Sequence, residues 1–218
     1  MPDQSARTEL RTELLVLQAV RLAGVADTDA VLDRTFLSDE AAARVLAEAD
    51  SGGAVEQFTF GDTSGWIITE AGSARLATLL SDEVASRDAT AVLVATLDAF
   101  EPLNDRFVGL VSRWQLESTS SASTGFGSTG TAEVDELLTS LTSVGADLRA
   151  TLADLIRALP RFGRYPAQYS AAVDRARHDG LRWITGVGLL SCHVVWAELH
   201  QDLLFSLGRD RLDDRANR

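Results

Sequence analysis

The chain has 218 residues, of which 20 are basic and 32 acidic, a formal net charge of −12, and 45% apolar residues. A chain of this length can bury a sizeable core as one large domain or as two small ones. No apolar run reaches the roughly 18 residues that span a bilayer, and the polar start of the sequence lacks the pattern of a signal peptide. We therefore expect a cytoplasmic protein that does not enter a membrane.

The first part of the sequence predicts three helices, a hairpin and a fourth helix. Leucines and valines recur at helical spacing over residues 8–23, a short helix follows, and Ser38 caps a third helix. Two short strands at 55–60 and 66–68 then flank a turn-rich tip, and the next helix begins at Thr69. This order is typical of a winged helix-turn-helix domain.

The rest of the sequence predicts helices only. A long helix over about 82–116 contains Pro102, which should kink or divide it. Residues 117–131 are rich in Ser, Thr and Gly and predict a flexible loop. Shorter helices are expected at about 166–178 and 189–207.

Between the loop and Pro160 lies a helix with a heptad-like seam. Its apolar positions follow alternating steps of four and three: Val134, Leu138, Leu141, Gly145, Leu148, Leu152, Leu155 and Leu159. Such a seam packs either inside a helical bundle or against a second copy of the chain, and both alternatives stay open at this point.

Together these patterns predict a mainly α protein with two domains. Residues 8–82 form an N-terminal winged helix-turn-helix with a short β-hairpin wing, and residues 83–210, including the 117–131 loop, form an all-helical domain.

The segment Gly65-Trp66-Ile67-Ile68-Thr69-Glu70-Ala71-Gly72 resembles the wing-to-helix segment of MarR-type bacterial winged-helix proteins. Its residue types have physical roles in such a segment. Trp66 should pack the wing onto the core, Thr69 should cap the next helix, and Gly72 should let that helix pack closely.

Three segments of the second half carry a further resemblance: Arg161-Phe162-Gly163-Arg164-Tyr165-Pro166, Arg182-Trp183 and 191–204. They resemble a group of actinobacterial winged-helix proteins that have a helical C-terminal half and are described as transcription regulators. A similar helical segment accompanies enzymes related to pyruvate, phosphate dikinase. The resemblance covers nearly the whole chain except 117–131. It implies either a homodimeric transcription regulator or a protein-interaction module that regulates a phosphoenolpyruvate-utilising enzyme.

The distribution of charge argues against nucleic-acid binding. Residues 1–82 hold six arginines and fourteen carboxylates, whereas DNA-binding domains normally present a basic footprint. The side chains available for DNA contact on or near the third helix are Arg34, Ser38, Arg44 and Arg75. DNA therefore stays one possible partner and another protein the alternative.

A small-molecule pocket in the helical domain is a further hypothesis. Its candidate lining is polar and aromatic: Asn104, Arg106, Trp114, Tyr165, Arg182, Trp183, His193, Trp196 and His200. The sequence has no phosphate-binding loop and no nucleophile motif, so we do not expect an enzyme.

The cysteine and histidine content limits the metal sites that this chain could form. The single Cys192 excludes an internal disulfide and a zinc site built on cysteines. His193 and His200 are seven residues apart, whereas zinc-binding pairs on a helix are usually four apart. We interpret them first as hydrogen-bonded groups inside a helical bundle and second as residues of a small-molecule pocket. Metal binding is the least favoured interpretation. We expect no metal and no other cofactor.

Overall fold

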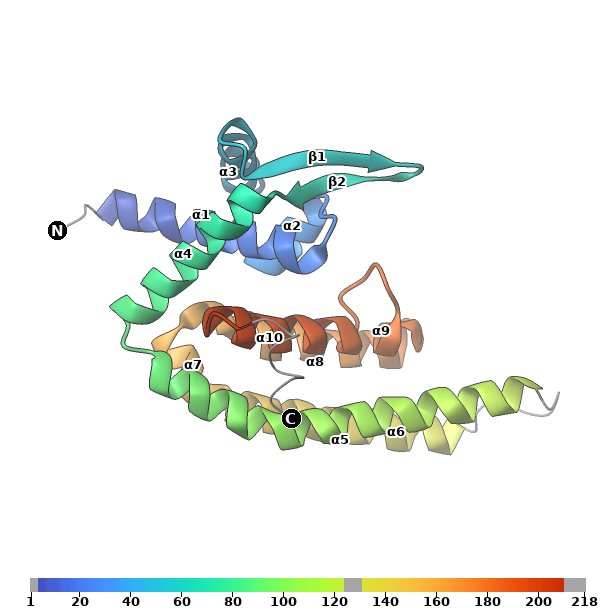
Figure 1. The fold of residues 1–218 in the computed structure, drawn as a ribbon. Helices are drawn as coiled ribbons and strands as arrows, with labels where there is room; N and C mark the ends of the chain where they lie inside the picture. The colour runs from blue at the N-terminus through green and yellow to red at the C-terminus, as the bar shows by residue number, and fades with distance from the viewer. Residues whose placement is uncertain (1–3, 124–130, 210–218) are drawn as a thin grey trace. The chain divides into compact units, whose positions relative to one another are not determined.

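The computed structural model describes residues 4–123 and 131–209 (Figure 1). This part of the chain is mainly helical and contains one two-stranded antiparallel sheet, which confirms the prediction of a mainly α protein. The chain divides into two compact units. The N-terminal unit holds the described residues up to Asp88 together with those from Leu204 onward, and the central unit holds Ala89–Leu203.

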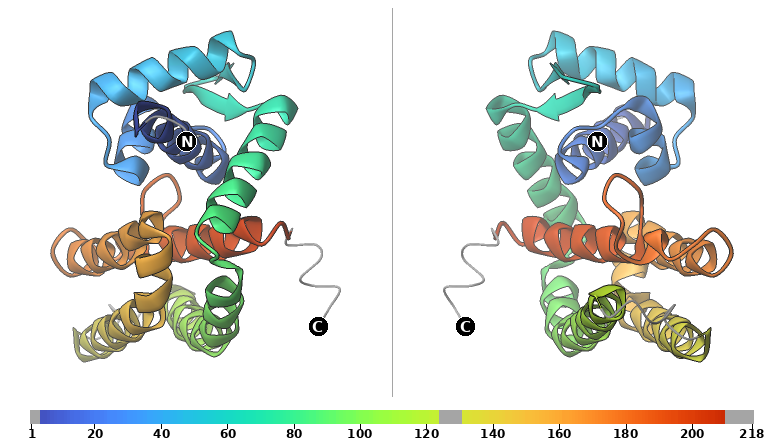
Figure 2. Two further views of the ribbon diagram at one scale, coloured as in Figure 1. Left: turned by 90° about the vertical axis from the view of Figure 1, so that its left-hand side faces the viewer. Right: turned by 90° about the vertical axis from the view of Figure 1, so that its right-hand side faces the viewer.

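The N-terminal unit is built around one central helix. Its elements are α1 (Gln4–Ala23), α2 (Thr28–Thr35), α3 (Asp39–Ser51), β1 (Val55–Phe60), β2 (Thr63–Ile68) and α4 (Glu70–Ser86). α1 packs against α2, α3, α4 and β2, so it lies at the centre of this unit (Figure 2). Leu17, Leu46, Leu76 and Leu80 are buried in the core that these elements enclose.

The two strands form a hairpin in which Val55 pairs with Ile68 and Phe60 with Thr63. Backbone hydrogen bonds between Ala26 and Trp66, at 2.7 and 2.9 Å, attach the segment before α2 to the outer edge of β2. The hairpin is therefore fixed at its base, while its tip extends away from the core.

The segment Gly65–Gly72 packs as its residue types predict. The Thr69 hydroxyl accepts a hydrogen bond from the Gly72 N–H at 3.0 Å and so caps α4. Trp66 packs against the core. A Cβ on Gly72 would lie 1.9 Å from the Ala54 carbonyl oxygen, so only glycine fits there. The expected roles of Trp66, Thr69 and Gly72 are confirmed.

The helix expected to start near Asp82 begins later. α4 runs through the predicted domain boundary to Ser86, and α5 (Thr90–Ser123) starts after a short break. Asp88 adopts a left-handed backbone conformation with φ of 50° in that break. No Gly or Pro lies there, so the sequence carries no ordinary signal for it.

Two further expectations for α5 are corrected. Of the two outcomes expected at Pro102, a kink or a division, the division does not occur, because a proline removes a single N–H and the flanking hydrogen bonds can continue. The backbone of 117–123 is helical, so the expected loop does not begin at residue 117. Residues 124–130 of that loop lie outside the described residues.

The central unit is a set of packed helices. After α5 come α6 (Thr131–Thr151), α7 (Ala153–Ala158), the 3₁₀ helix η1 (Pro160–Gly163), α8 (Arg164–His178), α9 (Arg182–Thr185) and α10 (Cys192–Ser206), whose last residues belong to the N-terminal unit. α5 and α6 run side by side, and α6 also packs on α8 (Figures 1 and 2).

The heptad-like seam faces the interior of the chain. Leu141, Leu148, Leu152, Leu155 and Leu159 along it are completely buried. The seam is thus a bundle interior and does not offer a surface to a second copy. None of the helices in the described ranges is long and apolar enough to cross a bilayer.

Candidate functional site

The third helix, α3, carries one arginine on its exposed side. Arg44 donates from Nη1 to both carboxylate oxygens of Glu48, at 2.9 and 3.1 Å. The Ser38 hydroxyl accepts a hydrogen bond from the Ala41 N–H at 3.3 Å, so this side chain caps the helix. Both predicted DNA-contacting groups of α3 therefore already make a hydrogen bond within this unit.

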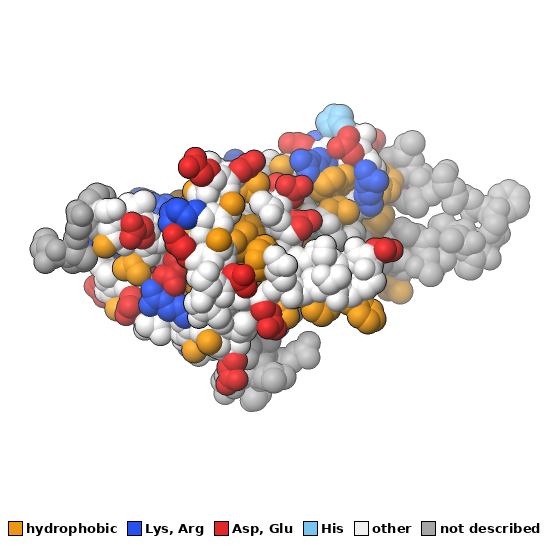
Figure 3. Space-filling view, turned by 90° about the horizontal axis from the view of Figure 1, so that it is seen from above, with side chains coloured by type: hydrophobic (Ala, Val, Ile, Leu, Met, Phe, Trp, Pro, Cys, Tyr) orange, Lys and Arg blue, Asp and Glu red, His pale blue; other side chains and the backbone are white. Residues whose placement is uncertain are grey.

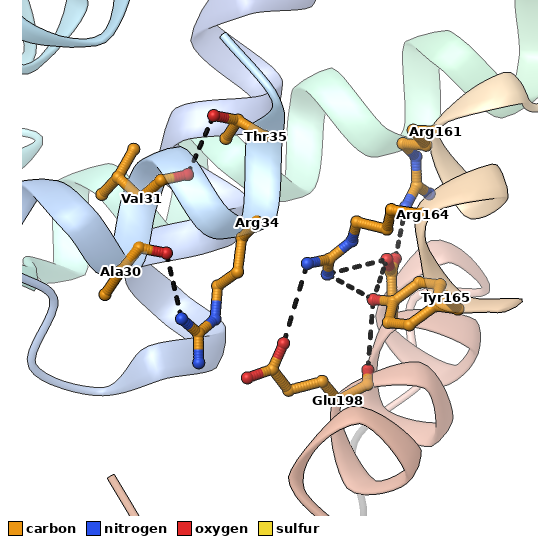
Figure 4. Close-up of polar contacts among 9 residues, drawn as sticks. Ala30, Val31, Arg34, Thr35, Arg161, Arg164, Tyr165 and Glu198 are labelled. Carbon is orange, nitrogen blue, oxygen red and sulfur yellow. Dashed lines mark hydrogen bonds and ion pairs between the residues drawn. The ribbon is translucent and has the colours of Figure 1, made fainter. Parts of the chain in front are cut away.

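The other two predicted DNA-contacting arginines are also engaged. Arg34 is buried, and its Nη1 donates to the Ala30 carbonyl at 3.0 Å (Figure 4). Arg75 donates from Nε and Nη2 to the two carboxylate oxygens of Glu13, at 2.8 and 2.7 Å, and thereby joins α4 to α1. The hydrogen bond to Glu13 raises the pKa of Arg75, so this guanidinium stays charged and paired.

The exposed surface of the N-terminal unit is acidic along α3 and apolar at two aromatic side chains. Asp39, Glu40 and Asp50 are exposed along α3 together with the Arg44–Glu48 pair. Two aromatic rings are also exposed in this unit: Phe36, after α2, is 66% exposed, and Phe60, at the end of β1, is 78% exposed. Figure 3 looks onto α3 and the strands and shows carboxylates with apolar side chains between them. We call the exposed side chains of α3, together with Phe36 and Phe60, the α3 surface.

A buried polar cluster lies in the central unit. Its five members come from η1, the first turn of α8 and α10: Arg161, Arg164, Tyr165, Glu198 and Asp202. Arg161 forms an ion pair with Asp202, and these side chains are only 3% and 2% exposed. The Tyr165 hydroxyl donates to Asp202 Oδ2 at 2.6 Å and accepts from Arg164 Nη2 at 2.5 Å (Figure 4). Arg164 Nη1 lies 3.7 Å from Glu198 Oε2.

The charges of this cluster balance, with two guanidinium groups facing two carboxylates. Burial raises the pKa of Tyr165, so its hydroxyl keeps the proton that it donates to Asp202. Buried ions are tolerated only when they are paired and hydrogen-bonded. The cluster therefore fixes η1 and the start of α8 against α10.

Most of this cluster was not predicted from the sequence, since only Tyr165 was among the candidate pocket residues. Two spacings were the available signal. Arg161 and Arg164 are three residues apart, on either side of the junction between η1 and α8, and Glu198 and Asp202 are four apart, on one face of α10.

Three of the candidate pocket residues meet around Phe100. The Trp196 Nε1–H donates to Asn104 Oδ1 at 3.0 Å, and the Trp196 ring stacks on Phe100 with centroids 5.0 Å apart. The His200 ring lies 5.5 Å from Phe100, and its Nε2 is 3.7 Å from Glu101 Oε1. These aromatic side chains are core packing, with polar atoms paired at the edge.

The remaining candidates lie elsewhere in the central unit. Arg106 binds Asp147 at 2.5 Å and Ser143 at 3.0 Å. Trp183 lies under the Arg175 guanidinium at 4.5 Å. Arg182 and His193 are exposed.

Trp114 lines a pocket of about 200 Å³ between α5 and α6, and no other candidate residue lines that pocket. The nine residues are thus distributed over several places, and a ligand pocket formed by all of them stays a prediction.

Among the described residues, no group of three His, Cys, Asp or Glu side chains is arranged to hold a metal ion. Cys192 is buried, and burial raises the pKa of its thiol to about 12, so it is a poor nucleophile at neutral pH. Comparison with protein-family models, with curated proteins and with solved structures gives no match to this chain. The family resemblance and the functions that it implies therefore stay predictions.

Proposed function

We propose that the N-terminal unit is a winged helix that binds another protein, and that the chain acts as a protein-interaction module. The order of three helices, an antiparallel hairpin and a fourth helix supports the winged-helix assignment. So does the tight packing of Gly72 against Ala54 where the hairpin meets α4. In this assignment α3 occupies the position of a recognition helix and the hairpin that of the wing.

One observation carries the choice of partner: α3 exposes four carboxylates and one arginine, and each arginine proposed for DNA contact already engages a group of its own chain. Exposed ion pairs are weak, about 0–1 kcal/mol, so Arg44 could leave Glu48 at little cost. The carboxylates would nevertheless stay beside the DNA. They would repel phosphates that lie within the Debye length of about 10 Å. Net repulsion, more than the loss of ion pairs, disfavours a DNA complex.

The exposed rings of Phe36 and Phe60 favour a protein partner. Aromatic side chains are enriched in protein interfaces, where their burial supplies much of the binding energy. The resemblance to segments that accompany dikinase-related enzymes indicates the class of partner. We therefore propose a phosphoenolpyruvate-utilising enzyme that is regulated by contact with the α3 surface.

The test is an affinity capture from a lysate of the source organism, repeated with purified components. The variant Phe36→Asn/Phe60→Thr removes both exposed rings and places residues suited to the backbone at each position. Val187→Thr, which alters a side chain that is 92% exposed in the central unit, is the matched control. The wild type and the control should retain the enzyme, and the double variant should not.

Two results would contradict this proposal. One is equal retention of the enzyme by the double variant and the wild type. The other is recovery of no protein except the chain itself, together with specific binding to a DNA duplex. The second result would favour the alternative, a homodimeric transcription regulator.

A further inference from the structure

We infer that the central unit contains a binding pocket for a small α-amino acid with an apolar side chain. The pocket lies between α5 and α6 and has a volume of about 200 Å³. Three of its lining residues come from α5 and four from α6. All of them belong to the central unit, so the inference does not depend on the proposed role of the α3 surface.

The wall that α5 provides carries hydrogen-bond donors. Leu110, Arg113 and Trp114 share one face of the helix, because the second and third lie three and four residues after the first. Arg113 donates from Nε to the Gly109 carbonyl at 3.4 Å and forms no ion pair with any described residue. The Trp114 Nε1–H is buried and has no hydrogen-bond partner in the described ranges. Buried polar groups nearly always have a partner, so both donors favour an anionic group of a ligand.

The wall that α6 provides is acidic. It consists of Glu133, Glu136, Leu137 and Ser140, which recur at helical spacing on one face. Arg113 forms no ion pair with either glutamate, although all three side chains line the same pocket. Glu136 makes no hydrogen bond or ion pair with the described part of the chain. The two carboxylates and the Ser140 hydroxyl can therefore accept hydrogen bonds from an ammonium group.

The two walls together define the class of ligand. A simple cation would lie beside the guanidinium of Arg113, and a simple anion would lie beside the two carboxylates, so each would be repelled by one wall. An α-amino acid carries both charges, and the planar fork of donors on a guanidinium matches the two oxygens of its carboxylate.

The apolar part of the lining and the volume limit the side chain of this amino acid. Leu137 is buried and Leu110 is half-buried, so both offer apolar surface to the ligand. Burial of a hydrocarbon side chain against them is favourable. The volume lies below the roughly 300–1,000 Å³ of sites for drug-sized ligands, which favours a single amino acid over a peptide.

Isothermal titration of the full chain with L-leucine tests the inference. Three control ligands each lack one part of leucine: 4-methylpentanoate the ammonium group, 3-methylbutylamine the carboxylate, and glycine the apolar side chain. We expect saturable binding of leucine, with a Kd on the order of 1 mM. Each control ligand should bind at least about tenfold more weakly, because it leaves one wall or the apolar surface without its partner.

Four variants locate the binding. Arg113→Gln and Glu136→Gln should each weaken leucine binding at least about fivefold, through the loss of one charged partner. Ser140→Leu should abolish binding by filling the pocket while leaving every charge in place. Asp135→Asn removes a carboxylate that is exposed on α6 but does not line the pocket, so binding should be unchanged. Circular dichroism confirms that each variant is folded.

Three kinds of result would overturn the inference. One is the absence of saturable leucine binding by the wild type. Another is equally tight binding of any one of the three control ligands. The third is unchanged binding in a folded pocket variant, or an equal loss of binding in Asp135→Asn and Glu136→Gln.

Discussion

The exposed ion pairs of the N-terminal unit and the buried cluster of the central unit use arginine in different ways. In the N-terminal unit, Arg44 and Arg75 form ion pairs that are partly exposed to solvent. In the central unit, Arg161 and Arg164 lie in a buried cluster with Asp202, where solvent is excluded. The same residue type thus pairs with carboxylates at the surface in these N-terminal ion pairs and fixes packed helices in the buried cluster.

This difference indicates which charges matter for stability and which for recognition. Removing one partner of an exposed pair leaves a charge that water solvates, whereas removing one partner of a buried pair leaves an uncompensated ion. Substitutions in the central cluster should therefore affect folding, and substitutions on α3 should affect what the protein binds.

The largest effect is expected from Asp202→Ala. This change leaves Arg161 and Arg164 buried without their shared carboxylate. We expect it to lower the free energy of unfolding by about 3–5 kcal/mol. Asp147→Ala, which breaks the exposed pair with Arg106, is the matched control and should cost about 0–1 kcal/mol. Equal losses for the two variants in urea denaturation would remove the distinction between buried and exposed pairs.

A smaller effect is expected in the N-terminal unit from Gly72→Ala. Its new Cβ would lie 1.9 Å from the Ala54 carbonyl oxygen, so α4 and the hairpin must separate. Overpacking of this kind costs about 1–3 kcal/mol. Gly109→Ala in α5 meets nothing within 4 Å and should instead stabilise by up to about 1 kcal/mol. The two melting temperatures should move in opposite directions, and a shift of the same sign would contradict the close packing.

The buried thiol of Cys192 predicts an alkaline sensitivity of the central unit. Burial raises the pKa of this thiol from 9.0 to about 12, so between these pH values the unfolded chain loses a proton that the folded chain keeps. The contribution of the Cys192 thiol to the free energy of unfolding is therefore fully present below pH 9. It is lost as the pH rises toward 12, at up to about 1.4 kcal/mol per pH unit. The free energy of unfolding should fall less steeply in Cys192→Ala than in the wild type over this window. Parallel slopes would show that the thiol does not titrate differently on unfolding.

The smallest effect on stability is expected on α3. Glu48→Gln removes the partner of Arg44 from an exposed i,i+4 pair, which should cost about 0.3–0.5 kcal/mol. The measurement is the midpoint of urea unfolding. A decrease in the free energy of unfolding of more than about 2 kcal/mol would contradict the account, because it would show that this exposed pair stabilises the fold as a buried pair does.

The N-terminal unit was largely predictable because its signals are local. Ser38 caps α3, and the requirement for glycine at position 72 follows from its packing on Ala54. The break after α4 was not predictable, since Asp88 adopts a left-handed conformation without a Gly or Pro nearby.

The buried cluster was mostly missed for a different reason. Arg161 and Asp202 are 41 residues apart in the sequence, and arginine and aspartate are usually solvated. Only the packing of η1 and α8 on α10 makes them partners. Conversely, Trp196 had the chemistry of a pocket residue, but its ring stacks in the core and its N–H is paired with Asn104.

The proposal that the α3 surface binds protein and not DNA is tested most directly by a salt-dependent DNA titration. Fluorescence anisotropy with a labelled duplex from the chain's own upstream region and a random duplex, at low and moderate salt, gives the number of phosphate contacts from the slope of log K against log salt. We predict no saturable binding of either duplex, with Arg44→Gln indistinguishable from the wild type. Tighter binding of the upstream duplex, with a salt slope that falls by about one in Arg44→Gln, would contradict the account.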